Sequence, residues 1–330
     1  MRPSLPRGTG ELADRGGRRE QSESTAGQPE GYSACFLGQS ELAGLMRRFE
    51  WEQTSIGSPD QWPESLKTAI RIILTSRQPF WLGWGEELIY FYNDPHKSII
   101  GGKHPTAPGQ PTSVVWREIW DPLLASALGG KEGTYVEEQR LIMERNEYPE
   151  ETYYTYSYSP IISDDGTVGG IICANTDDTQ RVIAERQLAL LRELAARTAD
   201  ARNREQACER AAQALATNPY DLPFAMIYAA GPVPDLLTLF GSTGIDPGHA
   251  AASTTLPLSG DRIWPVAAAL VHREPQFISH LKEAFPGSPP TGAWSQPPNQ
   301  AIVLPLPGGD AGDAAVLIAA LNPFRLFDES

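Results

Sequence analysis

Hydrophobic residues recur at helical spacing soon after the start of the chain. The segment 40–49 begins with Ser40, a residue type that caps helices, and then carries apolar side chains three and four positions apart. These apolar residues are Leu42, Leu45, Met46 and Phe49. The pattern predicts a short amphipathic helix that leads into the first domain.

A second apolar stripe follows Pro63, and proline is favoured at the first position of a helix. Its members lie at positions i, i+3, i+4, i+7 and i+8, which form one face of a helix. They are Leu66, Ala69, Ile70, Ile73 and Leu74. We expect this helix to end before Pro79, because proline cannot continue the helical hydrogen bonds.

After Pro79 the spacing of the apolar residues changes from that of a helix to that of a β-strand. Short aromatic and β-branched runs at 80–84 and 88–92 are separated by a glycine turn, which predicts a hairpin that ends at Asn93. A stretch interrupted by glycines and prolines follows, with one helical pattern between Trp116 and Leu128. Short helices and loops are expected there.

Three more runs with strand character lie at 135–145, 152–162 and 168–175. The last two are joined by Asp164-Asp165-Gly166, a strong signal for a tight hairpin turn. The first domain is therefore predicted to be α+β, with a five-stranded antiparallel sheet and short helices.

A helix is predicted over 180–202, and its apolar positions alternate three and four residues apart. The seam consists of Leu188, Leu191, Ala195 and Thr198, broadened by Leu190 and Leu194. Such a seam can pair with a second copy, so we expect a parallel homodimer through this linker helix. Packing of the helix against the chain's own domains is the alternative.

The second half of the chain predicts a helix followed by a sheet. Apolar residues share one face of the segment 204–216, and Asn218-Pro219 ends that helix. Strand-like runs follow, separated by turns rich in glycine and proline. These runs lie at 224–229, 236–240, 301–306 and 314–320. A second α+β domain is expected.

Composition narrows the classes of partner. The formal net charge of −14 repels nucleic-acid phosphate and anionic lipid, so we expect neither nucleic acid nor a membrane as a partner. The longest apolar runs are far shorter than the roughly 20 residues that cross a bilayer, and no secretory signal is visible. Cys35, Cys173 and Cys208 form no C-x-x-C pair, which argues against a disulfide framework or a cysteine zinc site. A cytoplasmic location is expected.

The order of elements in the first half resembles that of a PAS domain. Asn93 ends the second strand, glycines follow it, and Asp165-Gly166 lies between the last strands. Asp177-Asp178-Thr179 then runs into a helix, which resembles the Asp-x-Thr junction where PAS domains pass their signal to a linker helix. The carboxylates and hydroxyl could cap that helix and so tie the strand to its position. An ordinary N-cap at Asp178 or Thr179 is the simpler interpretation.

The apolar runs at 301–307 and 315–325 are similar to the closing strands of GAF domains. Together the two halves resemble the input region of bacterial PAS–GAF sensor histidine kinases, without the kinase domains. The segment 1–35 is rich in Gly, Ser, Arg and Glu and nearly lacks aliphatic residues, which predicts a disordered tail. The patterns and the resemblance together divide the rest into a lead helix and loop at 36–62, a PAS domain at 63–179, a linker helix at 180–202 and a GAF-like domain at 203–330. Because a GAF domain usually ends with a further helix, the GAF-like domain is expected to be truncated.

The resemblance implies a signal-input module of a two-component system. Its PAS and GAF domains would sense a small molecule or a partner and alter the linker helix, with a histidine kinase or response regulator as the output partner. The alternative is the input portion of a sensor histidine kinase whose catalytic half is missing, so that the activity would be ATP-dependent autophosphorylation. A photoreceptor or redox sensor that binds bilin or haem is a third hypothesis.

Motifs for catalysis and cofactors are weak in this sequence. Gly101-Gly102-Lys103 and Gly129-Gly130-Lys131 lack the Ser or Thr of a phosphate-binding loop, and no constellation for hydrolysis or metal binding is found. We therefore expect no catalytic residues, and the cofactor stays unknown. Cys35 upstream of the PAS-like half resembles the bilin cysteine of bacterial phytochromes, but the GAF-like half lacks their Asp-Ile-Pro signature. No motif supports haem, flavin or bilin.

The best lead to a ligand is the aromatic content of the first domain, because apolar pockets with a few polar anchors bind small molecules. Plain core packing is the alternative for such aromatics. His96 could also turn toward a cavity or ligand, or else be a surface histidine beside Lys97. The candidate pocket residues are Phe80, Trp81, Trp84, Tyr92, Asn93, Trp116, Trp120, Tyr154 and Tyr156.

Overall fold

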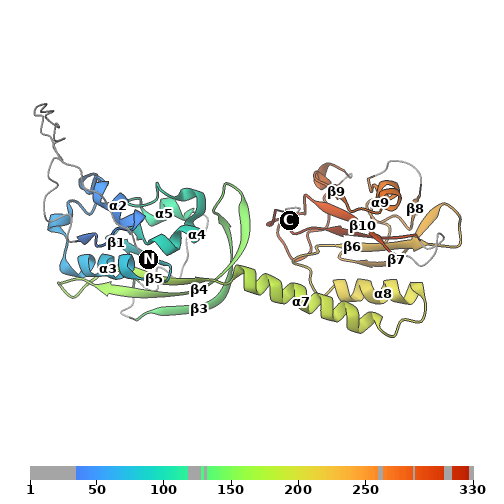
Figure 1. Cartoon of the computed structure of the whole chain (residues 1–330), viewed down its shortest axis with the longest axis horizontal. Helices are drawn as coiled ribbons and strands as arrows, with labels where there is room; N and C mark the ends of the chain where they lie inside the picture. The colour runs from blue at the N-terminus through green and yellow to red at the C-terminus, as the bar shows by residue number, and fades with distance from the viewer. Residues whose placement is uncertain are drawn as a thin grey trace, which may run out of the picture.

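The computed structural model describes residues 35–117, 128–129, 132–258, 263–284, 287–307 and 314–326. Within these residues the chain forms two α+β domains that lie side by side and are connected by one long helix (Figure 1). The predicted α+β fold class, with two antiparallel sheets and short helices, is confirmed. The predicted tail, apart from Cys35, and Trp120 lie outside the described residues.

The first sheet has five antiparallel strands in the order β2-β1-β5-β4-β3. The five strands predicted from the sequence are confirmed. Their bounds are β1 Phe80–Trp84, β2 Ile89–Tyr92, β3 Thr134–Glu144, β4 Pro149–Ile162 and β5 Val168–Asp177.

Two predicted helices precede this sheet, α2 at Glu41–Arg48 and α3 at Glu64–Thr75. The Ser40 side chain accepts a hydrogen bond from the N–H of Ala43, so it caps α2 as predicted. Shorter helical segments fill the connections. They are η1 Trp51–Gln53, η2 Pro59–Gln61, η3 Asp94–His96, α4 Lys97–Ile100, η4 Gly101–Lys103 and α5 Thr112–Val115.

Strand alternation sends the side chains of β1 and β2 to two different faces of the sheet. Trp81 pairs with Tyr92 in the register, so these rings share one face with Tyr90, whereas Leu82 and Phe91 point to the other face. Side chains of both faces are buried in one continuous core. The sheet therefore has helical cover on both sides near β1 and β2.

The segment that leads into the first domain packs into its core. Trp51 stacks on Phe91 with a ring separation of 4.7 Å, and Trp62 meets the same Phe91 edge-on. The carboxylate of Asp94, at the start of η3, accepts hydrogen bonds from the first N–H groups of α2, including Leu42 at 2.9 Å. Residues before Pro63 thus contribute to the same hydrophobic core as the sheet.

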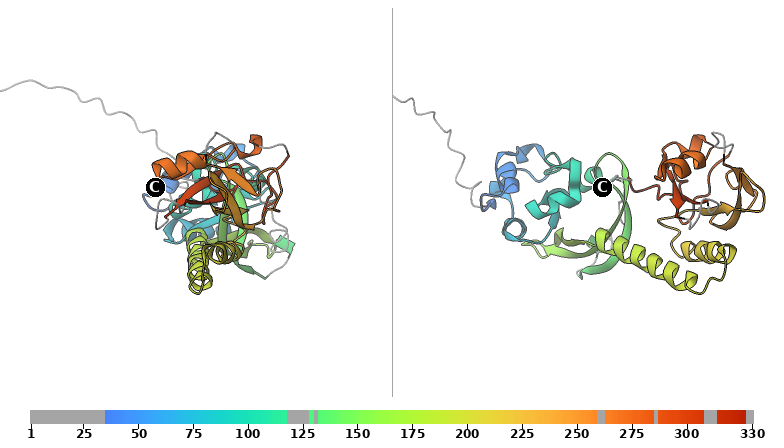
Figure 2. Two further views of the ribbon diagram at one scale, coloured as in Figure 1. Left: turned by 90° about the vertical axis from the view of Figure 1, so that its right-hand side faces the viewer. Right: turned by 45° about the vertical axis from the view of Figure 1, so that its right-hand side comes forward.

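Helix α7 (Thr179–Thr198) leaves the end of β5, and α8 (Arg204–Leu215) turns back along it (Figure 2). Leu190 and Leu194 of α7 pack with Cys208 and Ala212 of α8 in a small core on one face of the second sheet. The predicted linker helix is confirmed, and one of its faces packs within the chain. In the described part of the chain, no helix is both long and apolar enough to cross a bilayer.

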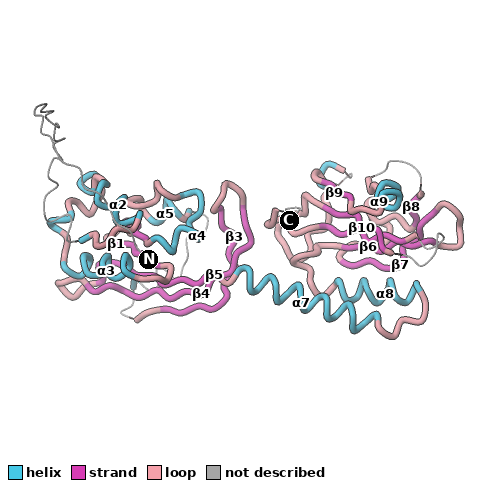
Figure 3. Tube along the Cα trace, in the orientation of Figure 1, coloured by secondary structure: helices cyan, strands magenta, loops and turns pink. Residues whose placement is uncertain are grey.

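The second sheet has six antiparallel strands in the order β8-β7-β6-β11-β10-β9 (Figure 3). The four predicted strands are β6 Ala225–Ala230, β7 Leu236–Thr243, β10 Ala301–Leu306 and β11 Ala315–Ala320. The edge strands were not predicted, because three residues are too few to show alternation. The additional elements are β8 Thr255–Pro257, α9 Val266–His272, β9 Gln276–Ile278 and η6 Leu281–Glu283.

Candidate functional site

The predicted pocket residues do not all line one space. Register places Tyr154 and Tyr156 of β4 on the sheet face that carries Trp81 and Tyr92, and Trp116 contacts this face through Tyr90. Phe80, Trp84 and Asn93 belong to the opposite face of their strands. The expectation that one cavity gathers the whole set is therefore corrected: the first group can surround a common site, and the second cannot.

Asn93 has a structural role at the end of β2. Its Oδ1 accepts a hydrogen bond from the N–H of Phe80 at 2.9 Å, and its Nδ2 donates to the carbonyls of Ile73 at 3.0 Å and Gln78 at 2.8 Å. The side chain is buried. Asn93 thus joins β2 to the end of α3 and the start of β1, where these backbone partners occupy its amide.

A chain of buried polar groups crosses the first face. The indole N–H of Trp116 donates to the hydroxyl of Tyr90 at 3.1 Å, and that hydroxyl lies 2.8 Å from Nε2 of His96. His96 is only 1% exposed, so the alternative of a surface histidine is wrong. Its Nδ1 is buried and has no hydrogen-bond partner. A buried polar atom without a partner costs about 1–3 kcal/mol, so this atom is suited to meet a ligand or a water molecule.

Burial controls the protonation of this chain. It lowers the pKa of His96 to about 3, so the imidazole is neutral at pH 7. It also raises the pKa of the Tyr90 hydroxyl well above its usual value, and the neighbouring Tyr92 and Tyr154 add to the shift. If Tyr90 donates to Nε2, the imidazole proton sits on Nδ1 and needs an acceptor. No group of three His, Cys, Asp or Glu residues suited to a metal ion is found in the described ranges.

A surface hollow of about 370 Å³ lies close to this polar chain. The ammonium group of Lys103 lies 4.0 Å from the centre of the Trp116 ring and donates to the carbonyl of Val115 at 2.7 Å. Trp116 therefore contacts both Lys103, which lines the hollow, and Tyr90. The hollow is lined by Lys103, Thr106, Ala107, Gln110, Val114, Val115, Arg117 and Glu144.

Tyr154 connects the pocket face with the start of the linker helix. Its ring is buried among the core aromatics, and its hydroxyl donates to the carboxylate of Asp177 at 3.4 Å. Arg145 contacts both groups, at 3.2 Å to the Tyr154 hydroxyl and 3.3 Å to Asp177. A displacement of Tyr154 would therefore be felt at the end of β5.

The predicted junction Asp177-Asp178-Thr179 is built as a bridge between β4 and α7. Asp177 accepts a hydrogen bond from the N–H of Thr179 at 3.0 Å, so this carboxylate satisfies a free N–H of the helix start. The Thr179 hydroxyl instead accepts from the N–H of Tyr153 in β4, also at 3.0 Å. Asp178 accepts from the hydroxyl of Thr155 at 2.6 Å and makes no capping bond of its own. The simpler interpretation, an ordinary N-cap at Asp178 or Thr179, is thus replaced by contacts to the strand.

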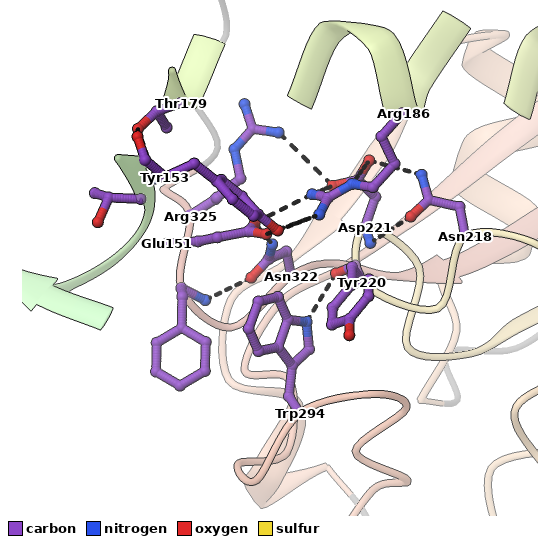
Figure 4. A network of polar contacts seen from close by, with 12 residues as sticks. Glu151, Tyr153, Thr179, Arg186, Asn218, Tyr220, Asp221, Trp294, Asn322 and Arg325 are labelled. Atoms are coloured by element: carbon purple, nitrogen blue, oxygen red, sulfur yellow. Dashed lines mark hydrogen bonds and ion pairs between the residues drawn. The ribbon is translucent and has the colours of Figure 1, made fainter. Parts of the chain in front are cut away.

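About two turns further along α7, Arg186 joins the two domains (Figure 4). Its guanidinium contacts both carboxylate oxygens of Glu151 in β4, at 2.7 and 3.1 Å, and the Tyr153 hydroxyl at 3.2 Å. The remaining N–H groups reach both carboxylate oxygens of Asp221, which follows α8 in the second domain. All five N–H groups of this arginine are therefore used by partners from two domains.

The second domain also contacts Glu151 directly. The amide of Asn322, just after β11, donates to the Glu151 carboxylate at 2.6 Å, and the N–H of Glu151 donates to the carbonyl of Phe324 at 2.9 Å. The Glu151 side chain is 0% exposed. We call Glu151, Arg186, Asp221 and Asn322 the interdomain network.

An aromatic contact extends this interface. Arg140 of β3 lies over the ring of Tyr220 at 4.7 Å and over the ring of Trp294 at 5.1 Å, both in the second domain. The indole N–H of Trp294 donates to the carbonyl of Tyr220, which holds the two rings together at 5.1 Å. The interface is therefore formed from ion pairs and a cation–π stack.

The charges of the interdomain network balance when the nearby Arg325 is included. Two carboxylates, Glu151 and Asp221, face Arg186, and Arg325 lies 3.9 Å from Asp221. Burial alone lowers the pKa of Arg186, but the hydrogen bonds and charges of both carboxylates outweigh it and raise the net pKa. Burial and the bond to Glu151 raise the pKa of Tyr153 to about 12, so it stays neutral. Because a buried charge left without its partner costs about 3–5 kcal/mol, removal of one member should loosen the whole contact.

Sequence reasoning missed this network because its members are far apart in the chain. Glu151 and Asn322 are separated by 171 positions, and no local pattern links them. One signal was present in β4, where Glu150 and Glu151 are adjacent. Since successive strand residues point to opposite faces, one of two adjacent carboxylates must face inward in a covered sheet and needs a cationic partner.

Comparisons with known proteins found similarity among solved structures alone. No protein-family model matches this chain, and no curated protein matches it. A GAF domain of a phosphoenolpyruvate-protein phosphotransferase from Acinetobacter is similar in structure, with 16% identity and a TM-score of 0.33 over 43% of this chain and 81% of that chain.

Two PAS domains are also similar. The one from a Colwellia psychrerythraea protein has 17% identity and a TM-score of 0.28, and covers 35% of this chain and 98% of its own. The PAS domain of BvgS from Bordetella pertussis has 17% identity and a TM-score of 0.26, and covers 38% of this chain and 93% of its own. These three neighbours are one GAF and two PAS domains. As labels that follow the sequence resemblance, we call the parts before and after α7 the PAS-like and GAF-like domains.

Proposed function

We propose that this chain is a signal-input module in which a change in the PAS-like domain is transmitted to α7 and the GAF-like domain. PAS and GAF domains are signal-sensing modules, which supports the assignment at this level. The observation that carries the proposal is Arg186, whose five N–H groups are divided between Glu151 and Tyr153 of the PAS-like sheet and Asp221 of the GAF-like domain. A shift of β4 moves the carboxylate of Glu151, and Arg186 must then change its contacts with both the PAS-like sheet and Asp221.

The signal enters, in this proposal, on the sheet face that carries Trp81, Tyr92, Trp116, Tyr154 and Tyr156. A small molecule that accepts a hydrogen bond from Nδ1 of His96 would satisfy a buried polar atom beside that face that has no partner in the described chain. Its arrival would move Tyr90 and the adjacent Tyr154, whose hydroxyl contacts Asp177 at the start of α7.

The output side of the proposal follows the sequence resemblance. We propose a homodimer through α7 and a histidine kinase or response regulator of a two-component system as the downstream partner, in the cytoplasm. All three cysteines are buried and unpaired, as a reducing compartment requires. Addition of the chain to a histidine kinase from the same genome should change its rate of autophosphorylation, and a kinase that never responds would argue against that partner.

Transmission can be tested by hydrogen-exchange mass spectrometry. Trp116→Phe removes the indole N–H that donates to Tyr90 and leaves an aromatic ring in its place. We expect faster exchange not only in the PAS-like domain but also in the first turns of α7 and around Asp221. In an Arg186→Met background, the effect of Trp116→Phe around Asp221 should disappear.

Arg197→Met is the matched control for that background, because Arg197 lies on the same helix and forms its ion pair with Glu193 at the surface. With this control the distant effect of Trp116→Phe should persist. An effect confined to the PAS-like domain, or one that reaches Asp221 equally well without Arg186, would refute the proposed transmission.

A further inference from the structure

Helix α7 presents an apolar stripe that nothing in the described chain covers. Leu188 is 48% exposed and Leu191 is 62% exposed, although Leu190 and Leu194 of the same helix are packed against α8. Ala184 and Ala195 continue the exposed stripe at either end, so its members are spaced four, three and four residues apart. This is the spacing of a coiled-coil seam.

We infer that this stripe pairs with the same stripe of a second copy in antiparallel orientation. The inference rests on the proposed homodimer and goes beyond it by assigning the orientation and the contacting residues. The order small-large-large-small reads the same in both directions, so an antiparallel pair places Leu188 against Leu191 of the second copy. The same axis places Ala184 against Ala195, where two small side chains let the helices approach closely.

Charges at the edge of the stripe favour the antiparallel pair. Glu185 and Arg192 lie seven residues apart and therefore on one flank of the stripe, and both are exposed. In its own helix Glu185 pairs with Arg181 at 3.3 Å at the exposed edge of the stripe. An antiparallel pair brings the flanks at heptad position e of the two helices together, so Glu185 also meets Arg192 of the second copy, twice across the two-fold axis. In a parallel pair the opposite flanks of the two stripes meet instead. Glu185 would then face Gln180 of the second copy, and Arg192 would face Gln187 of the second copy.

The residue that precedes the stripe gives a second reason. Arg181 lies seven positions before Leu188, in line with the seam, and would face its own copy in a parallel pair. Its guanidinium already pairs with Glu138, Asp178 and Glu185 of its own chain. In the antiparallel pair it faces Thr198, so these ion pairs are not brought against their own copies. The inferred orientation therefore differs from the parallel one expected from the heptad pattern alone.

Disulfide trapping distinguishes the two orientations. The native cysteines are buried, and burial raises the pKa of each, to about 11 for Cys35, so they react little. In the antiparallel dimer a mixture of Ala184→Cys and Ala195→Cys chains should give cross-linked dimers, whereas either variant alone should not. Self-cross-linking of Ala184→Cys alone would overturn the orientation and leave the homodimer intact.

Sedimentation equilibrium tests the dimer and its charges. Leu191→Lys should abolish association, whereas Val271→Lys, at a 77% exposed apolar residue on α9, should not affect it. Glu185→Arg should raise the dissociation constant about tenfold, because two attractive pairs become repulsive, and Glu185→Arg with Arg192→Glu should restore it. A chain that stays monomeric at every concentration would overturn both the homodimer and its orientation. A charge reversal without effect would overturn the orientation alone.

Discussion

At the residue scale, His96 combines deep burial with an incomplete set of hydrogen bonds. Its Nε2 contacts the Tyr90 hydroxyl, and its Nδ1 faces no partner. Tyr90 and Tyr92 surround the ring, and burial raises the pKa of both, so neither supplies a charge that could stabilise an imidazolium. The imidazole is therefore kept neutral by the core around it.

This burial predicts a specific pH dependence. The folded-state pKa of His96 is about 3, below its usual value of 6.5, so the unfolded chain takes up the proton first as the pH falls. Stability is fully present above pH 6.5 and is lost toward pH 3, by about 1.4 kcal/mol per unit. Between pH 6.5 and 5.0, urea unfolding of the wild type should lose about 2 kcal/mol more than His96→Gln. Equal slopes for the two proteins would contradict a neutral buried His96.

At the scale of elements, the junction between β5 and α7 depends on side chains that bind strand backbone. The hydroxyl of Thr179 accepts from the buried N–H of Tyr153, and the N–H of Asp178 donates to the carbonyl of the same residue. The first turn of α7 is therefore fastened to β4 as well as to β5, the strand from which it continues. Movement of β4 must be accompanied by movement of the helix start.

Thr179→Val removes that hydroxyl while keeping the shape of the side chain. The N–H of Tyr153 loses its acceptor inside the protein, so we expect a loss of about 1–3 kcal/mol in the free energy of unfolding. Hydrogen exchange should also accelerate in the first turn of α7. Thr176→Val, at an exposed position of β5, is the control and should change stability by less than about 0.5 kcal/mol. If both substitutions behave alike, Thr179 does not fasten the helix.

The elements were largely predictable because periodicity is a local property. Helices α2, α3, α7 and α8 and the longer strands of both sheets were found from apolar spacing, and Asp177–Thr179 was found as the junction. The edge strands β8 and β9 were missed because three residues carry no period. The interdomain network was missed because its members are far apart in the sequence, with separations of 35 positions for Arg186 and Glu151 and 171 positions for Asn322 and Glu151. Contacts over such separations are decided by the packing of whole domains.

The pocket was predicted only in part for a related reason. Aromatic composition identified the right strands, but a residue's face depends on the register between strands. Trp81 and Trp84 differ by an odd number of positions, so they point to opposite faces. Trp84 lies over Gly169, where a Cβ atom would come within 2.4 Å of its ring, and it serves the packing of β1 on β5.

At the scale of the whole molecule, two domains with separate cores are joined by α7 and by a polar interface. The larger cores lie within each domain, whereas the contact between the domains consists of Glu151, Arg186, Asp221 and Asn322 with the Arg140 stack beside them. Polar contacts of this kind depend on geometry more strongly than apolar ones do. The relative position of the domains should therefore respond to small changes in β4.

Distances between the domains measured by double electron–electron resonance test this account most directly. Spin labels at Ile72→Cys on α3 and Val271→Cys on α9 occupy exposed positions, one in each domain. With the labelled chain diluted in an excess of unlabelled chain, so that distances between two copies do not contribute, the account predicts a single narrow distance distribution. This distribution should persist in Arg197→Met and become broad in Arg186→Met. An Arg186→Met distribution that superimposes on that of the wild type would contradict the claim that the interdomain network couples the two domains.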